Sequence, residues 1–213
     1  MNAALSASRP ATPRGRIDKQ QAVLAAALTV FVRSGYTQAR VDEIAAEANV
    51  AKATVYNHFG DKETLFRQVV QTLTDNALTA NLAAVELLTK NGDDLPANLR
   101  AAGWQLATCY CAEESRALRR LVSAEASQFP DLLDIVDEVP RRVLGALADR
   151  LARLSLSGSL HLDDPDLAAT QFAALLTGSV DTRSRSGTRR IPDSELRVIT
   201  DAAAATFLRA FGR

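Results

Sequence analysis

The chain has 213 residues, of which 47% are hydrophobic but only 5% aromatic, so its core is expected to consist mainly of Ala, Leu and Val. Its 25 Lys and Arg residues balance its 25 Asp and Glu residues, which argues against a protein that coats nucleic acid through bulk positive charge. No apolar run reaches the roughly 18 residues of a membrane span, and the N-terminus has no apolar signal-peptide core. We therefore expect a cytoplasmic protein with no membrane partner.

The sequence offers little for catalysis or metal binding. His58 and His161 are the only histidines, no Gly-rich phosphate loop precedes a helix, and no Cys/His spacing is typical of a metal site. We expect no enzyme, no catalytic residue, no metal and no cofactor. Cys109 and Cys111 are two residues apart in a predicted helix and point to different sides, so they are poorly placed to form a disulfide. Buried structural cysteines are the commoner outcome, and a redox-sensing role is the alternative.

The first 66 residues begin with an arm and a helix. Residues 1–15 mix small residues with two prolines and two arginines, which predicts a disordered N-terminal arm. The first helix is expected from about Ile17 to Ser34, where Gly35 provides a stop. Its predicted inner stripe consists of Ile17, Gln21, Leu24, Leu28 and Phe31.

Two short helices are predicted next, separated by a turn at Asn49. The first has apolar positions three and four apart, namely Val41, Ile44, Ala45 and Ala48, and the second repeats this spacing with Val55 and Phe59. This is the pattern of a helix-turn-helix, whose second helix is presented to the DNA major groove. The polar residues left on its outer sides, Lys52, Thr54, Tyr56, Asn57 and His58, suit phosphate and base contacts, although an ordinary solvated helix is polar too.

The rest of the chain is also helical in pattern, and the fold class is all-α. One long helix is expected from Lys62 to about Lys90, and a polar, mobile loop at 183–190. Pro140 is expected to kink or interrupt the helical stretch in which it lies. The other predicted helices run from Asp94 and Pro96 to about Ala112, from Ser115 to Ser127, from Asp131 to Ser155, from Asp164 and Pro165 to about Thr182, and from Pro192 to the C-terminus.

The N-terminal stretch resembles the DNA-binding domain of the tetracycline-repressor (TetR) family of bacterial transcription regulators. The matching residues are Phe31, Gly35, Tyr36, Ile44, Ala45, Ala48, Val50, Thr54, Tyr56, His58, Phe59, Lys62, Glu63, Leu65 and Phe66. The resemblance implies a three-helix DNA-binding domain at 16–66, with its helix-turn-helix at about 40–59, and a helical ligand-binding and dimerisation domain at 67–213. The implied DNA-binding residues are Arg40, Val41, Lys52, Ala53, Thr54, Tyr56, Asn57, His58 and Lys62.

Three residues depart from the family pattern. Arg40 stands where the family usually has a Ser or Thr that caps the second helix, and losing such a cap typically costs about 1 kcal/mol. Ala51 stands where a Ser often caps the recognition helix, and Ala53 replaces a frequent Gly. These departures bear on base preference and DNA affinity.

Residues 118–176 more loosely resemble the C-terminal domain of the AefR-like branch of these regulators. The last two helices carry apolar stripes that pack within the chain or, as the resemblance implies, form the four-helix interface of a homodimer. The implied interface residues are Phe172, Leu175, Leu176, Ser179, Leu196, Ile199, Ala203 and Phe207. Such a dimer would hold two reading heads about 34 Å apart on double-stranded DNA with a palindromic operator.

The resemblance implies a repressor that leaves its operator when an unknown small-molecule effector binds the C-terminal domain. Trp104, Tyr110, Arg119 and Gln171 are the candidate pocket residues, and for each of them core packing or a surface ion pair is the commoner role. The alternative function is a helical small-molecule-binding or interaction protein that has lost DNA recognition. The modest charge of the N-terminal region and the departures at Arg40 and Ala51 motivate this alternative.

Overall fold

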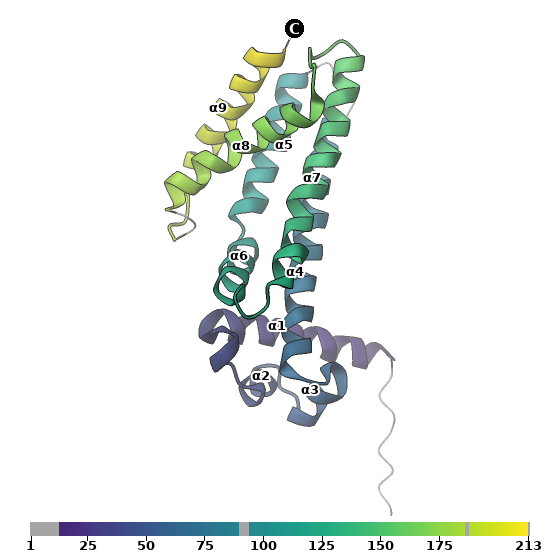
Figure 1. Ribbon diagram of the computed structural model, residues 1–213, viewed down its shortest axis with the longest axis vertical. Coiled ribbons are helices and arrows are strands. Elements are labelled where there is room, and N and C mark those ends of the chain that lie inside the picture. Colours follow the sequence, from purple (N-terminus) through teal and green to yellow (C-terminus); the bar gives the residue numbers. More distant parts are fainter. Residues whose placement is uncertain (1–12, 90–93, 186–187, 213) are drawn as a thin grey trace, which may run out of the picture. The chain divides into compact units, whose positions relative to one another are not determined.

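The computed structural model describes residues 13–89, 94–185 and 188–212, and most of the predicted N-terminal arm lies outside these ranges. The described residues are helical, as expected for an all-α fold, with one isolated β-bridge between Leu160 and Gly212. The elements are α1 (Pro13–Gln38), α2 (Val41–Glu47), α3 (Lys52–Phe59), α4 (Lys62–Val85), the 3₁₀ segment η1 (Glu86–Thr89), α5 (Leu95–Cys111), α6 (Glu113–Glu125), α7 (Asp131–Leu156), α8 (Pro165–Ser184) and α9 (Asp193–Phe211) (Figure 1).

The chain divides into two compact units, Met1–Val69 and Val70–Arg213, and the division falls within α4. In the first unit, α1 contacts α2 and α2 contacts α3. The regular part of α1 ends where predicted, because Gly35 adopts φ 70° and ψ 170°, a conformation that only glycine takes without strain. The residues just after Gly35 still carry helical hydrogen bonds, and this extends α1 to Gln38.

The buried face of α1 differs from the predicted stripe. Its core residues are Val23, Ala26, Ala27, Val30 and Phe31, and each is at most 5% exposed. Of the predicted stripe, Phe31 is buried and Leu24 and Leu28 are half-buried, whereas Gln21 is exposed and Ile17 is 56% exposed. The helix is rich in Ala, whose small side chain suits either face, so apolar spacing alone did not select the face that is buried.

The helix-turn-helix follows the predicted pattern. Val41, Ile44 and Ala45 are buried on α2, and Val55 and Phe59 are buried on α3. Asn49, in the turn between them, has a φ of 51°, a left-handed conformation that Asn adopts more readily than most residues. Because the buried residues are four apart on α3, its opposite side faces solvent.

In the second unit, α5 contacts α6, α8 and α9, and Figure 1 shows α8 crossing α5 between α7 and α9. The core is aliphatic with two aromatic rings, Phe172 and Phe207, whose centroids lie 5.1 Å apart. A Cβ atom added at Gly103 of α5 would lie 3.4 Å from side-chain atoms of Phe172 and of Leu176 on α8. Such a Cβ would make ordinary van der Waals contact, so Gly103 marks a place where α5 packs directly against these two side chains of α8.

The helix boundaries in this unit agree with most sequence signals. Asp94 and Asp164 cap α5 and α8 by accepting hydrogen bonds from the backbone amides of Ala97 and Leu167, each at 2.9 Å. The expected interruption at Pro140 is wrong, because α7 continues through it. A proline removes one helical hydrogen bond, and packing along the remaining turns keeps the helix continuous. The predicted mobile loop is shorter, since α8 extends to Ser184 and residues 186–187 lie outside the described ranges.

Thr74 on α4 generates a stability prediction. Its side chain is 2% exposed, and its hydroxyl has no hydrogen-bond partner in the described part of the chain. A buried hydroxyl without a partner is destabilising, and valine has nearly the same shape without it. Thr74→Val should raise the free energy of unfolding by about 1 kcal/mol, measured by chemical denaturation.

Thr79→Val is the matched control on the same helix. The Thr79 hydroxyl is exposed and donates to the carbonyl oxygen of Asp75 at 2.9 Å. The control therefore makes the same chemical change where no buried, unpaired hydroxyl is removed. If both substitutions raised the free energy of unfolding equally, the gain would come from replacing Thr by Val in this helix. The explanation by a buried hydroxyl without a partner would then be wrong.

Candidate DNA interface and ligand cavities

Helix α3 presents the side chains expected of a DNA-reading helix. Lys52, Ala53 and Asn57 are exposed and Tyr56 is 42% exposed, whereas Thr54 and His58 are half-buried. Amide and hydroxyl groups of this kind hydrogen-bond to base edges and phosphate oxygens. Val41 does not belong to this surface, because its side chain is buried in the core of the unit.

Lys52 is held by an acidic neighbour. Its Nζ atom lies 2.9 Å from the Asp42 carboxylate on α2 and 6.0 Å from the centroid of the Tyr56 ring. The hydrogen bond to Asp42, followed by the charge of Asp42, raises the pKa of Lys52 above its usual value. A phosphate would have to compete with this carboxylate for the ammonium group.

Two of the departures from the family pattern leave a helix without a side-chain cap. Arg40 is the N-cap residue of α2 and Ala51 that of α3, and neither makes a side-chain capping hydrogen bond. The helix after α3 is capped, since the Asp61 carboxylate accepts from the backbone amide of Thr64 at 2.7 Å. This hydrogen bond lowers the pKa of Asp61.

The structure gives Lys62 a different role from the predicted phosphate contact. Its ammonium group donates to the carbonyl oxygens of Tyr36, Thr37 and Ala39 at 2.9, 3.4 and 3.1 Å. It also lies 4.4 Å from the centroid of the Tyr36 ring. These contacts join the start of α4 to the end of α1, at Tyr36 and Thr37, and to Ala39 between α1 and α2. Sequence spacing alone does not reveal this contact across more than 20 residues.

The second unit contains a cavity that we call the apolar cavity, with a volume of about 510 Å³. Its walls come from α4, α5, α6, α7 and α8, and most of the lining is aliphatic. Pro140 is part of its lining together with Val136. Since Pro140 has no amide hydrogen, the carbonyl oxygen of Val136 lacks its usual helical donor. Such a mainly apolar enclosure with a few polar groups suits an organic ligand.

A second cavity, which we call the arginine cavity, has a volume of about 490 Å³. It is formed by the C-terminal parts of α5 and α8, the start of α6, the start of α9 and the segment before α9. Trp104 lines this cavity alone, and Tyr110 and Arg119 line both cavities. Gln171 lines neither of them and lies in a shallow groove between α8 and α9. The four predicted pocket residues are therefore not brought together in one site.

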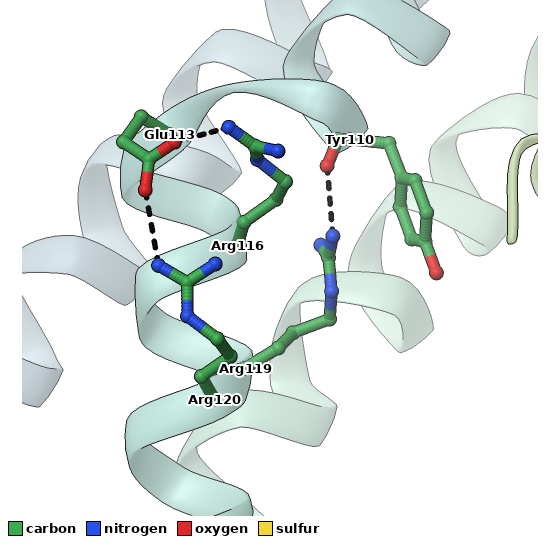
Figure 2. A network of polar contacts seen from close by, with 5 residues as sticks. All are labelled: Tyr110, Glu113, Arg116, Arg119 and Arg120. Atoms are coloured by element: carbon green, nitrogen blue, oxygen red, sulfur yellow. Dashed lines mark hydrogen bonds and ion pairs between the residues drawn. The ribbon is translucent and has the colours of Figure 1, made fainter. Parts of the chain in front are cut away.

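Tyr110 and Arg119 form a wall shared by the two cavities. The Arg119 guanidinium lies 4.0 Å from the centroid of the Tyr110 ring and donates to the Tyr110 carbonyl oxygen at 3.0 Å, as Figure 2 shows for the hydrogen bond. The Tyr110 hydroxyl donates to Asp181 at 2.8 Å. Burial and this hydrogen bond raise the pKa of Tyr110 to about 12. The phenol therefore stays protonated as a donor at neutral pH.

The cysteines have the environment of structural thiols. Cys109 lines the apolar cavity and Cys111 lines the arginine cavity. Burial raises the pKa of both thiols, which disfavours the thiolate needed for redox reactions. This environment gives no support to a redox-sensing role.

The predicted dimer interface requires correction. Six of its residues are at most 4% exposed within one chain, and so they cannot supply contact surface to a partner: Phe172, Leu176, Leu196, Ile199, Ala203 and Phe207. Of the other two, Leu175 is half-buried and Ser179 is exposed. The apolar stripes predicted as the interface are therefore the faces of α8 and α9 that pack inside the chain. The outward faces carry small or apolar exposed residues such as Ala174, Gly178, Ala202 and Val198.

The described residues contain neither a metal-binding cluster nor a membrane-spanning helix. No group of three or more His, Cys, Asp or Glu side chains is arranged there to hold a metal ion. None of the helices in the described ranges has the length and hydropathy needed to cross a membrane.

An all-helical chain that presents α3 from a helix-turn-helix has the architecture of a DNA-binding transcriptional regulator. Residues 23–69 match the bacterial regulatory proteins of the tetR family, and residues 97–213 match the C-terminal domain of AefR-like transcriptional repressors. The chain belongs to the TetR family of transcriptional regulators.

Known proteins resemble the chain over most of its length. The uncharacterized HTH-type transcriptional regulator YvkB of Bacillus subtilis (strain 168) is 24% identical over 184 residues, which cover 85% of this chain and 92% of YvkB. The solved structure of a TetR-family regulator from Mesorhizobium loti MAFF303099 has a TM-score of 0.84 and 29% identity, with 95% of this chain and 100% of that chain covered. The flavonoid-responsive regulator FrrA has a TM-score of 0.70 and 27% identity, with 91% and 97% covered.

The contacts of Lys62 lead to a prediction about the first unit. Lys62→Met keeps much of the aliphatic side chain but leaves three carbonyl oxygens without their charged donor. It should lower the stability of the first unit by about 2 kcal/mol, because hydrogen bonds to charged groups are worth more than neutral ones. Thermal unfolding followed by calorimetry would measure the loss.

Lys52→Met is the matched control in the same unit. Lys52 is exposed and pairs only with exposed Asp42, and surface ion pairs of this kind contribute little. The control should unfold close to the wild-type temperature. If both variants unfolded alike, the proposed structural role of Lys62 would be wrong.

Proposed function

We propose that this regulator is a cytoplasmic repressor that binds a palindromic operator as a homodimer and is released by a small-molecule ligand. The observation that carries the DNA-reading part is the exposed side of α3, where Lys52, Tyr56 and Asn57 are available while Val55 and Phe59 anchor the helix. Asn57 suits base edges, and Lys52 and Tyr56 suit phosphate oxygens. Thr54 and His58 flank this surface, and the exposed Ala53 stands on it where the family frequently has Gly.

Arg40 is the further candidate phosphate contact in this unit. It is exposed at the start of α2, and no ion pair involves it in the described part of the chain. Its guanidinium takes the place of the hydroxyl that usually stands there in the family. Lys62 is left out of the proposed contact surface, since its ammonium group is directed to three carbonyl oxygens.

The apolar cavity is the proposed effector site. Its volume of about 510 Å³ lies in the range of drug-sized ligand sites. FrrA, a structural neighbour, is described as flavonoid-responsive, and an aromatic ligand of that size suits the aliphatic walls of the apolar cavity. The ligand must bind more tightly to the conformation that does not bind DNA, because its differential affinity sets the size of the shift between the two conformations.

Release of labelled operator by a flavonoid is the first measurement of the effector site. Flavonoid binding that left the operator complex unchanged would contradict this assignment.

The outward faces of α8 and α9 are the proposed dimer interface. Leu175 and Ser179 stay in this assignment, and the exposed Ala174 and Gly178 would allow a partner helix to approach closely. Two shallow grooves lie on this side, of about 430 and 420 Å³, and Leu175 lines both. The buried residues Phe172 and Phe207 support this surface from behind through their ring contact.

The operator test is a fluorescence-anisotropy titration at several salt concentrations, with DNA from beside the gene and scrambled DNA of equal length. Selective binding with a salt-dependent affinity is expected. Lys52→Gln should reduce the affinity and lower the salt slope by about one per head, because one phosphate contact is lost. Asp42→Asn should raise the affinity, since it releases Lys52 from its ion pair and removes a negative charge.

Glu47→Gln is the matched control for Asp42→Asn. It removes the same charge from the same helix, but Glu47 forms no ion pair with Lys52. An equal gain in affinity from both would show a general charge effect and contradict the competition for Lys52. If selection from random DNA recovered no preferred sequence, the chain would have lost DNA recognition, and the alternative of a ligand-binding or interaction protein would replace this proposal.

The dimer is tested with Ser179→Arg, which places a charge on the outward face of α8 and repeats it in the partner. Sedimentation velocity should then show a monomer at concentrations where the wild type is a dimer. Ala80→Arg, an equal change at an exposed position of α4, should leave the dimer intact. A Ser179→Arg protein that stays dimeric would place the interface elsewhere.

A further inference from the structure

We infer that the arginine cavity is a second ligand site, separate from the apolar cavity, and that it binds a small organic carboxylate with an apolar body. The inference rests on the composition of this cavity, and it does not depend on DNA binding. Its two parts, an apolar floor and a positively charged rim, come from different elements of the second unit.

The floor of the arginine cavity is a small hydrophobic cluster. Val180 of α8, Ile191 of the segment before α9 and Leu196 of α9 are at most 6% exposed, and Trp104 of α5 is half-buried against them. The Arg197 guanidinium lies 4.1 Å from the centroid of the Trp104 ring. The floor therefore offers an indole ring and aliphatic side chains to the apolar part of a ligand.

The rim carries more positive than negative charge. Four arginines line the cavity, namely Arg116, Arg119, Arg189 and Arg190, against two carboxylates, Glu113 and Asp193. Two further carboxylates lie nearby and are engaged, since Glu195 pairs with Arg183 and Arg189, and Asp181 accepts the Tyr110 hydroxyl. A net positive cavity of this kind favours an anionic ligand.

Not all of these guanidinium groups are neutralised within the chain. Glu113 is shared between Arg116 and Arg120, as Figure 2 shows, and the hydrogen bond from Arg120, followed by the charge of Arg116, lowers the pKa of its carboxyl. Arg119 instead contacts the ring and carbonyl oxygen of Tyr110. Within the described ranges neither Arg119 nor Arg190 forms an ion pair, so two charges at this cavity are left for a ligand. Arginine binds carboxylates and phosphates through two parallel hydrogen bonds, and of the two a carboxylate on an apolar body also matches the hydrophobic floor of the cavity.

The chain contains its own reporters for this site. Trp104 is the single tryptophan, and it lines the arginine cavity but not the apolar cavity. The two cysteines are divided in the same way, with Cys111 in the arginine cavity and Cys109 in the apolar cavity. Binding in one cavity is therefore distinguishable from binding in the other.

The experiment titrates the full chain with 3-phenylpropanoate and with its neutral analogue 3-phenylpropanamide while Trp104 fluorescence is followed. The carboxylate should change the fluorescence with saturation and bind about tenfold more tightly than the amide, with an affinity that falls as salt is added. Equal affinities for the two compounds, or no saturable change with the carboxylate, would overturn the proposal.

Arg190→Gln is the informative variant, because Arg190 is exposed, lines the arginine cavity but not the apolar cavity, and forms no ion pair with another described residue. It should weaken carboxylate binding about fivefold to tenfold and leave amide binding unchanged. Arg153→Gln, an exposed arginine of α7 that lines neither cavity, is the matched control and should change nothing. Carboxylate binding that is equally strong in both variants would contradict the proposed role of the rim.

Single-cysteine variants locate the bound ligand. In Cys109→Ser the carboxylate should slow alkylation of Cys111, and in Cys111→Ser it should leave alkylation of Cys109 unchanged. The opposite pattern would place the ligand in the apolar cavity and overturn the assignment to the arginine cavity. Circular dichroism of each variant confirms that the fold is retained.

Discussion

The DNA-reading unit depends on one ammonium group. After the kink at Gly35 the chain passes through the end of α1 into α2, and carbonyl oxygens at such a helix end need donors from elsewhere. Lys62 donates to three of them from the first position of α4, over the face of Tyr36, whose ring stands 4.9 Å from that of Phe66. The aromatic contact and the charged donor together hold α4 against this turn. Because α2 starts directly after it, the placement of α3 follows from the same contact.

The features predicted correctly from the sequence are local ones. The helix-turn-helix, the stop at Gly35 and the helix starts at Asp94 and Asp164 each depend on residues within a turn or two of each other. The incorrect predictions concern which face of a helix is buried and what it packs against. An Ala-rich helix such as α1 has apolar residues on more than one side, and the stripes on α8 and α9 do not reveal whether they face the chain's own core or a partner. Phe172 and Phe207 were assigned to a partner and meet each other instead.

The cavities were least accessible to sequence reasoning, because a cavity is the space that packed helices leave open. Trp104, Tyr110 and Arg119 were chosen as candidates for their chemistry, and all three do line cavities, but they do not line the same one. The α7 residues of the apolar cavity, such as Val139 and Val143, look like ordinary core positions in the sequence. Only Pro140, inside a helix, gave a local signal there, and it was interpreted as a kink or an interruption of the helix.

A neutral chain that binds DNA must obtain its affinity from the position of a few charges. One of these charges is the ammonium group of Lys52 at the start of α3. In the free protein it is paired with the Asp42 carboxylate at 2.9 Å. Exposed pairs of this kind contribute little stability, so a phosphate can replace the carboxylate at small cost. Exchanging one exposed ion pair for another brings a small net gain from this contact, and the proposed homodimer would gain affinity by binding its second half-site at a high effective concentration. In that proposal a ligand that changed the separation of the two heads would act on this second binding step.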